Sequence, residues 1–177
     1  SNPLLRRMRR FGGTDDFLEL LARVRAATPT AGVRSNVIVG FPGETEADLG
    51  QLELFLAMGR LDVVGVFGYS DEDGTEAEGL DGKLPAEVIQ ERVARVTDLV
   101  EQLTAQRAEE RVGESVVVLV EEVDEGIALG RSEIQGPDVD GVTRLDGMPS
   151  GSRPAVGEFV RAVVVGSEGV DLVAEAR

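Results

Sequence analysis

Residues 33–49, with the sequence VRSNVIVGFPGETEADL, hold the groups best suited to bind a ligand. Gly40 and Gly43 lie where a short apolar run ends and a segment with helical spacing begins. Backbone N–H groups at the start of a helix point outward and attract anions, and glycine lets a ligand approach the backbone closely. The segment is therefore a candidate cradle for a phosphate or a cofactor, and its alternative role is that of a structural strand-to-helix corner. It is neither a Walker loop nor a dinucleotide-binding fingerprint, because the residues that define those motifs do not follow.

The chain contains no cysteine and no histidine. Disulfides, thiolate zinc sites and iron–sulfur ligation by this chain are thus excluded, and no metal ligand is predicted in it. The commonest general base is also missing. Any catalysis would rest on carboxylates, on lysine, on the single tyrosine, Tyr69, or on a borrowed cofactor.

Hydrophobic periodicity predicts an α/β arrangement for the first part of the chain. Thr14 is expected to cap a helix, and Gly59 to end the helix that begins after the glycine turn. The alternation predicts parallel strands with crossover helices, and two strands are too few for a covered parallel sheet. We therefore expect a piece of a larger α/β barrel or open sheet. The predicted strands are residues 36–39 and 63–69, and the main predicted helices begin at residues 14, 46 and 84.

The character of the sequence changes after Gly113. Short β-branched runs separated by turn signals are typical of a small antiparallel β-barrel of the OB-like kind. We predict two domains, residues 1–112 and residues 113–177. The predicted strands of the second domain are residues 115–120, 127–131, 142–145, 159–165 and 171–174.

The chain is strongly acidic, with 33 Asp and Glu against 18 Lys and Arg and a net charge of −15. Such a surface repels phosphate backbones and attracts basic partners, so tRNA binding is disfavoured. The one basic stretch could bind nucleic acid, pair with carboxylates or pack against the rest of a barrel; it holds Arg6, Arg7, Arg9 and Arg10. No apolar run reaches transmembrane length and the start lacks a signal pattern, so we expect a cytoplasmic protein without membrane contact.

Four stretches resemble, in the same order, the radical S-adenosylmethionine methylthiotransferase family. They are LLRRMRR, VIVGFPGETEADL, VFGYSDEDGTEA and a C-terminal region with GPDVDG and VDLV, and together they span essentially the whole chain. The resemblance implies part of a radical-SAM βα barrel for residues 1–112. It implies the family's terminal TRAM domain, an OB-like antiparallel barrel, for residues 113–177.

The loop after the Tyr-Ser pair differs between two branches of this family. The branch that modifies an adenosine of transfer RNA usually has a basic residue there, as in Ser-Pro-Arg-Pro-Gly-Thr. The branch that modifies an aspartate of a small-subunit ribosomal protein usually has acidic residues before Gly-Thr. This chain has SDEDGT at residues 70–75, the acidic kind.

The charge of the second domain agrees with that choice. It carries 13 acidic residues against 5 basic ones, which leaves −8. TRAM domains on RNA enzymes are expected to present positive charge to phosphates. An acidic one is complementary to a basic ribosomal protein, which is the partner that we predict.

The resemblance also implies cofactors that this chain cannot hold alone. The family uses S-adenosylmethionine and two 4Fe-4S clusters, ligated by a CxxxCxxC motif and by three further cysteines. The chain has neither set, so we expect it to be the C-terminal half of a longer enzyme and to be inactive by itself. In the whole enzyme a deoxyadenosyl radical would abstract hydrogen from the β-carbon of the substrate aspartate. No catalytic residue is assigned within this chain.

Binding residues follow from the resemblance position by position. Residues near the first strand are assigned to S-adenosylmethionine, with Ile38 and Gly40 flanking its adenine, and Glu44 is also expected to cap the next helix. Tyr69 and Ser70 are expected to line the substrate channel. The cofactor-binding candidates are Arg34, Asn36, Ile38, Gly40 and Glu44. The substrate-binding candidates are Tyr69, Ser70, Asp71, Glu72, Glu121, Glu122, Asp124 and Glu125.

Two alternatives remain open at this point. The first is the branch that modifies transfer RNA. The second is a non-catalytic binding module built on the OB-like barrel.

Overall fold

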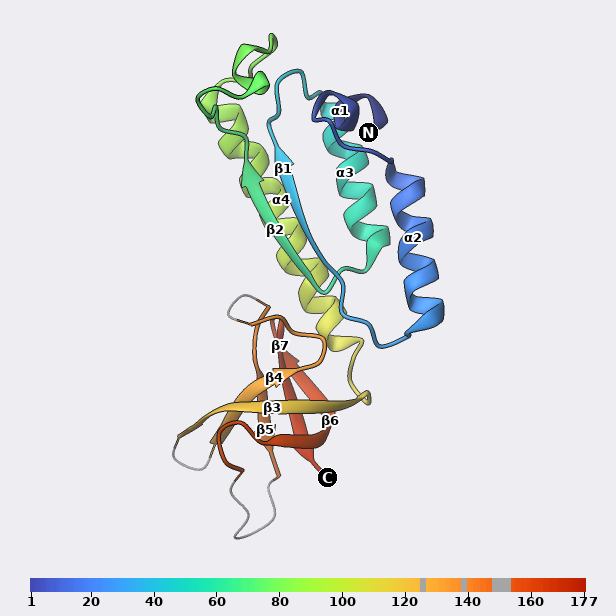
Figure 1. Cartoon of the computed structure of the whole chain (residues 1–177), viewed down its shortest axis with the longest axis vertical. Coiled ribbons are helices and arrows are strands. Elements are labelled where there is room, and N and C mark those ends of the chain that lie inside the picture. The colour runs from blue at the N-terminus through green and yellow to red at the C-terminus, as the bar shows by residue number, and fades with distance from the viewer. Residues whose placement is uncertain (125–126, 138–139, 148–153) are drawn as a thin grey trace. The chain divides into compact units, whose positions relative to one another are not determined.

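The computed structural model describes residues 1–124, 127–137, 140–147 and 154–177. The chain forms two compact units (Figure 1). The first contains Ser1–Pro29, Ser35–Arg60 and Val64–Leu103, and the second contains Thr30–Arg34, Leu61–Val63 and Thr104–Arg177.

The elements follow the predicted order. One short 3₁₀ helix, η1, lies within the acidic loop where only irregular structure was predicted. The helices are α1 (Asn2–Arg7), α2 (Thr14–Ala27), α3 (Glu46–Gly59), η1 (Glu76–Gly79) and α4 (Ala86–Glu109). The strands are β1 (Arg34–Val39), β2 (Val63–Gly68), β3 (Ser115–Asp124), β4 (Ile127–Ser132), β5 (Thr143–Asp146), β6 (Phe159–Glu168) and β7 (Asp171–Ala176).

β1 and β2 form a two-stranded parallel sheet. The carbonyl of Val33 accepts a hydrogen bond from Asp62 N, and the carbonyl of Val39 accepts one from Tyr69 N, so the pairing advances in the same direction along both strands. This confirms the parallel strands that the βα alternation predicted.

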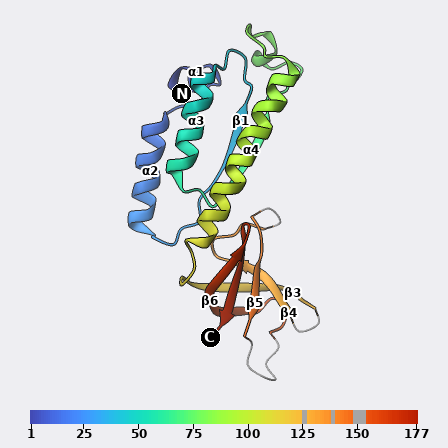
Figure 2. The same ribbon diagram turned by 180° about the vertical axis from the view of Figure 1, so that it is seen from behind.

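Helix α4 covers one face of this sheet, and it lies behind the strands in Figure 1 and in front of them in Figure 2. A Cβ built on Gly68 would lie 3.0 Å from Ile89 Cγ2, which shows how closely the strand and the helix pack. The opposite face is open, because the side chains of Ile38 and Phe67 are 42% and 55% exposed. The sheet is therefore covered on one side only, as expected for a piece of a larger barrel.

Two predicted helix ends are wrong by one residue. Gly13, and not Thr14, occupies the N-cap position of α2. Gly59 is the last residue of α3, and Arg60 is its C-cap with a left-handed backbone at φ 47°. Residue preference placed glycine at the left-handed position, but Gly59 is buried in the helix and the next residue makes the turn.

The second unit contains a closed five-stranded barrel with the strand order β3-β4-β5-β7-β6. β3 pairs with β6 and closes the ring. Four of the neighbouring pairs are antiparallel, and β5 and β7 are parallel. Five strands cannot alternate in direction around a closed ring, so at least one parallel pair is unavoidable. The predicted OB-like barrel is confirmed, with this one parallel pair as an addition.

The barrel is filled by alternate residues of its strands. Val116, Val118 and Val120 of β3 point inward, and Leu145 and Ala174 meet them from β5 and β7. The alternation explains why the short β-branched runs were recognisable as strands.

Gly130 is required for close packing of β3 against β4. A Cβ at this position would lie 2.0 Å from the carbonyl oxygen of Leu119, a backbone atom that cannot move alone. We expect Gly130→Ala to lower the free energy of unfolding by about 1–3 kcal/mol or more, as overpacking does. Urea unfolding of the chain measures this change.

Gly166 of β6 is the matched control. The nearest atom to a Cβ there is Val173 Cβ at 4.0 Å, an ordinary contact. Gly166→Ala should leave the stability unchanged or raise it by less than about 1 kcal/mol, because alanine reduces the entropy of the unfolded chain. Equal losses in both variants would contradict the assigned role of Gly130.

The α/β part followed by an all-β barrel confirms the predicted fold class. Within the described part of the chain, no helix is long and apolar enough to cross a membrane.

Candidate functional site

The turn after β1 is built around Gly40. Its backbone has φ +80°, which side chains rarely adopt, and a Cβ there would lie 2.7 Å from Ile89 Cγ1 of α4. Its N–H donates to Glu44 Oε1 at 2.9 Å. Glycine is thus needed for the turn itself and for its packing against α4, while the N–H group is already bound within the chain.

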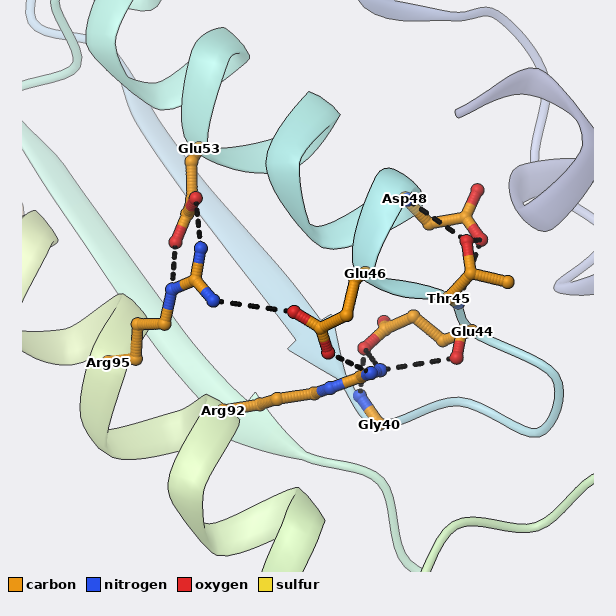
Figure 3. Close-up of polar contacts among 8 residues, drawn as sticks. All are labelled: Gly40, Glu44, Thr45, Glu46, Asp48, Glu53, Arg92 and Arg95. Atoms are coloured by element: carbon orange, nitrogen blue, oxygen red, sulfur yellow. Dashed lines mark hydrogen bonds and ion pairs between the residues drawn. The ribbon is translucent and has the colours of Figure 1, made fainter.

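Glu44 is held in the interior by Arg92 (Figure 3). Arg92 Nη1 donates to Glu44 Oε1 at 2.7 Å and to the Glu44 carbonyl at 3.2 Å. The side chain of Glu44 is 3% exposed and that of Arg92 is 8% exposed. Arg92 also pairs with Glu46 on the first turn of α3. Two carboxylates and a carbonyl around one guanidinium fix the turn to helix α4.

Thr45, and not Glu44, caps helix α3. Thr45 N donates to Asp48 Oδ2 at 2.9 Å, and Asp48 N donates back to Thr45 Oγ1 at 3.2 Å, which is a capping box (Figure 3). Burial raises the pKa of Asp48, but hydrogen bonds from Ser1 and Thr45 outweigh it and lower the pKa. The expected cap by Glu44 is therefore wrong, because its carboxylate faces Gly40 and Arg92.

Three of the cofactor candidates alternate along β1. Arg34, Asn36 and Ile38 are exposed, whereas Val37 and Val39, at the alternate positions of the strand, are buried. The carboxamide of Asn36 lies over β2, because a Cβ on Gly65 would come within 2.5 Å of its Oδ1.

Arg34 is the one of these three β1 residues for which the described structure shows an ionic partner. Its Nη1 lies 3.1 Å from Asp140 Oδ1 within the second unit.

The tyrosine–serine segment follows β2 and forms a small polar network. Tyr69 OH donates to Asp71 Oδ1 at 2.7 Å, and Lys83 Nζ pairs with the other carboxylate oxygen at 2.7 Å. Ser70 Oγ donates to Glu72 Oε1 at 3.3 Å. Both oxygens of Asp71 are thus engaged within the loop.

Tyr69 lies beside the glycine turn. Its ring meets that of Phe41 edge-on, with centroids 5.3 Å apart, and its N–H donates to the Val39 carbonyl. The structure therefore brings the tyrosine–serine segment and the glycine turn together at the carboxyl ends of the two parallel strands.

Tyr69 offers a direct optical measurement of this network. The hydrogen bond to Asp71 raises the pKa of Tyr69 to about 12. Only the neutral phenol donates, so the stabilisation is complete below about pH 10 and is lost as the pH rises through about 12. Asp71→Ala is expected to return the midpoint towards 10. Because Tyr69 is the only tyrosine and there is no tryptophan, tyrosinate absorbance reports this group alone.

Glu72→Ala serves as the control, because Glu72 contacts Ser70 and not the phenol. Its titration midpoint should match that of the unmodified chain. A midpoint near 10 in the unmodified chain would contradict the hydrogen bond to Asp71.

Three of the remaining substrate candidates lie on β3. Glu121 pairs with Arg131 Nε at 2.7 Å, while Glu122 and Asp124 are exposed on β3. Glu125 lies outside the described residues. The fold thus places three of the four acids on one strand.

The basic N-terminal stretch contacts acidic parts of the first unit. Arg9 pairs with Glu76 at 2.5 Å, and Arg7 donates to the Asp81 carbonyl at 3.3 Å. The Arg9–Glu76 contact agrees with the expected pairing with carboxylates, whereas Arg7 meets a backbone carbonyl instead.

Sequence reasoning missed two residues that shape this site: Arg92 and Lys83. Arg92 had a recognisable signal, because it lies four residues before Val96 in the apolar stripe of α4, where an arginine requires a buried partner. Lys83 carried no comparable signal, since its role depends on which residue the fold places beside it.

The sequence of residues 112–176 matches the model of the TRAM domain. Its relatives include ribosomal protein uS12 methylthiotransferases RimO from Kineococcus radiotolerans, Nocardioides sp. and Streptomyces avermitilis. They are 64%, 62% and 61% identical over 99%, 97% and 97% of this chain, and the matched parts make up 37%, 36% and 34% of their lengths.

The chain thus corresponds to the C-terminal part of ribosomal protein uS12 methylthiotransferases, and it spans about a third of their length. This similarity confirms the resemblance inferred from the four motifs.

Proposed function

We propose that the chain is part of an enzyme that methylthiolates the β-carbon of an aspartate in the small-subunit ribosomal protein uS12. The observation that carries this proposal is the similarity to uS12 methylthiotransferases over almost the whole chain. Residues 1–112 are proposed to be the C-terminal part of a radical-SAM βα barrel, and residues 113–177 the TRAM domain. The open face of the β1–β2 sheet supports the first assignment, because further barrel strands would cover it.

The open face of β1 fits S-adenosylmethionine in two respects. Ile38 supplies exposed apolar surface, and Asn36 supplies a carboxamide on the same face. We propose that these two side chains contact the cofactor, which supplies the radical chemistry when bound. Gly40 and Glu44 are proposed to contribute by shaping the turn, since the N–H of Gly40 donates to the carboxylate of Glu44. Arg34 is proposed to contribute from its position next to its ion-pair partner, Asp140.

The chain does not fit the two 4Fe-4S clusters of the proposed enzyme. It contains neither cysteine nor histidine, so the cluster ligands must come from other parts of the enzyme. The chain alone is therefore proposed to be inactive, and no reaction step is assigned to its residues.

The TRAM domain is proposed to recognise uS12 as a basic protein in the cytoplasm. Its charge of −8 favours encounter with a basic partner and opposes phosphate backbones. Glu121, Glu122, Asp124 and Glu125 are proposed to take part. In the first unit, Tyr69 and Ser70 are proposed to line the substrate channel. Asp71 acts through Tyr69, because its oxygens are engaged, and Glu72 adds negative charge.

Binding measurements separate this proposal from the branch that modifies transfer RNA. At about 150 mM salt, we expect the chain to bind uS12 at least tenfold more tightly than transfer RNA. Glu122→Lys combined with Asp124→Lys should weaken uS12 binding.

The control variant combines Glu87→Lys with Glu91→Lys on α4, which changes the net charge equally at two exposed positions outside the barrel. It should bind uS12 more tightly than the barrel variant does. Tighter binding of transfer RNA than of uS12 would overturn the choice of branch.

A further inference from the structure

A small cavity lies within the second unit, between the barrel and the end of α4. Its volume is about 20 Å³, which exceeds the roughly 10–15 Å³ that one water molecule needs. Gln135 and Asp140 contribute polar groups to its wall, and Val63 and Ala108 contribute apolar ones. All of these residues belong to the same compact unit.

The amide of Gln135 has a fixed orientation. Its Oε1 accepts hydrogen bonds from Ser132 N at 3.0 Å, Ser132 Oγ at 3.1 Å and Thr143 Oγ1 at 2.6 Å. Because a backbone N–H can only donate, Oε1 must face Ser132 and the NH₂ group must point elsewhere. Gln135 is only 6% exposed, and its Nε2 has no hydrogen-bond partner among the described residues.

Asp140 also lines the cavity, and it carries a buried acceptor without a hydrogen bond. Its Oδ2 accepts from Gly136 N at 2.9 Å. Its Oδ1 lies 3.1 Å from Arg34 Nη1 as an ion pair, but it accepts no hydrogen bond of good geometry within the described structure. The residue is 7% exposed. Two residues that line the cavity therefore each carry a buried polar atom without a hydrogen bond, one a donor and the other an acceptor.

The charged pair Arg111–Asp62, which also lines the cavity, already has its hydrogen bonds. Arg111 donates to Asp62 Oδ1 through Nε at 2.8 Å and Nη2 at 2.6 Å, and Asp62 Oδ2 accepts from Val33 N. A bound anion would be repelled by the Asp140 carboxylate, and a bound cation by the amide hydrogens of Gln135. Water both accepts and donates, so it suits both groups.

We propose that this cavity is a binding site for one ordered water molecule that accepts a hydrogen bond from Gln135 Nε2 and donates one to Asp140 Oδ1. Leaving a buried polar group without a partner is costly, so such a water is retained for long times. It joins Gln135, which follows β4, to Asp140, which precedes β5.

Nuclear magnetic resonance tests the site directly. In the 177-residue chain, rotating-frame cross-peaks between water and the side-chain NH₂ protons of Gln135 are expected, with the sign typical of a long-lived bound water. Absence of these cross-peaks would overturn the proposal.

A cavity-filling variant gives an independent readout. Val63→Ile adds one methylene beside the cavity and should displace the water, so the cross-peaks should vanish and the urea midpoint should fall. Val64→Ile makes the same change on the same strand away from the cavity wall, and it should keep the cross-peaks. Persistence of the cross-peaks in Val63→Ile would show that the water at Gln135 does not lie in this cavity, and a higher midpoint would show that the cavity was empty; either result would overturn the proposal.

Discussion

Replacing Arg92 by alanine is expected to lower the free energy of unfolding by about 3–5 kcal/mol. The substitution leaves the Glu44 carboxylate, 3% exposed, without its cation in the interior of the first unit. It also removes the hydrogen bond that Arg92 Nη1 donates to the backbone carbonyl of Glu44. Thermal and urea unfolding of the chain measure the loss.

Arg95→Ala is the matched control, one helical turn further along α4. Arg95 pairs with Glu53 and Glu46, but half of its side chain is exposed, so water replaces the lost partner at little cost. We expect a much smaller change for Arg95→Ala than for Arg92→Ala. Comparable losses of unfolding free energy for the two variants would show that the buried Arg92–Glu44 pair contributes no more to stability than the exposed pairs of Arg95.

The second large effect is expected for Asp62→Ala, again about 3–5 kcal/mol. Asp62 accepts three hydrogen bonds, from Arg111 Nε, Arg111 Nη2 and Val33 N, and its Oδ1 lies 3.2 Å from Arg107 Nε. Both arginines are almost fully buried, with side chains 2% and 6% exposed. Removing the shared anion leaves two buried cations with fewer acceptors. Urea unfolding, followed by circular dichroism, measures the change.

Asp146→Ala makes the same substitution at a surface ion pair. Asp146 is 44% exposed and pairs with Arg144, which is 37% exposed. Exposed pairs of this kind contribute little, so this variant should unfold close to the unmodified chain. An effect as large as that of Asp62→Ala would refute the role assigned to burial.

Local patterns predicted the elements well, because each depends on neighbouring residues. The apolar run at residues 37–39 and the glycines after it were sufficient to place a strand and a turn. The alternation in β3 was sufficient to place a barrel strand. The ends of elements were less predictable, as Gly59 and Arg60 show, because packing decided which residue makes the turn.

The candidate site was less predictable than the fold, since its contacts join residues far apart in the sequence. Glu44 was expected to cap the helix that follows it, yet its partner Arg92 lies 48 positions away. Asp71 was expected to attract a basic substrate, yet the chain's own Lys83 neutralises it. A carboxylate in a sequence shows that charge is present, but only the fold decides which cation it meets.

The ring order of the barrel also limits when it can form during synthesis. β7, the last strand, is bonded to both β5 and β6. As the chain leaves the ribosome from its N-terminus, β3 to β6 emerge first, and they cannot close a ring among themselves. The barrel is therefore complete only after translation has reached the last strand, and until then the nascent domain has two unprotected strand edges.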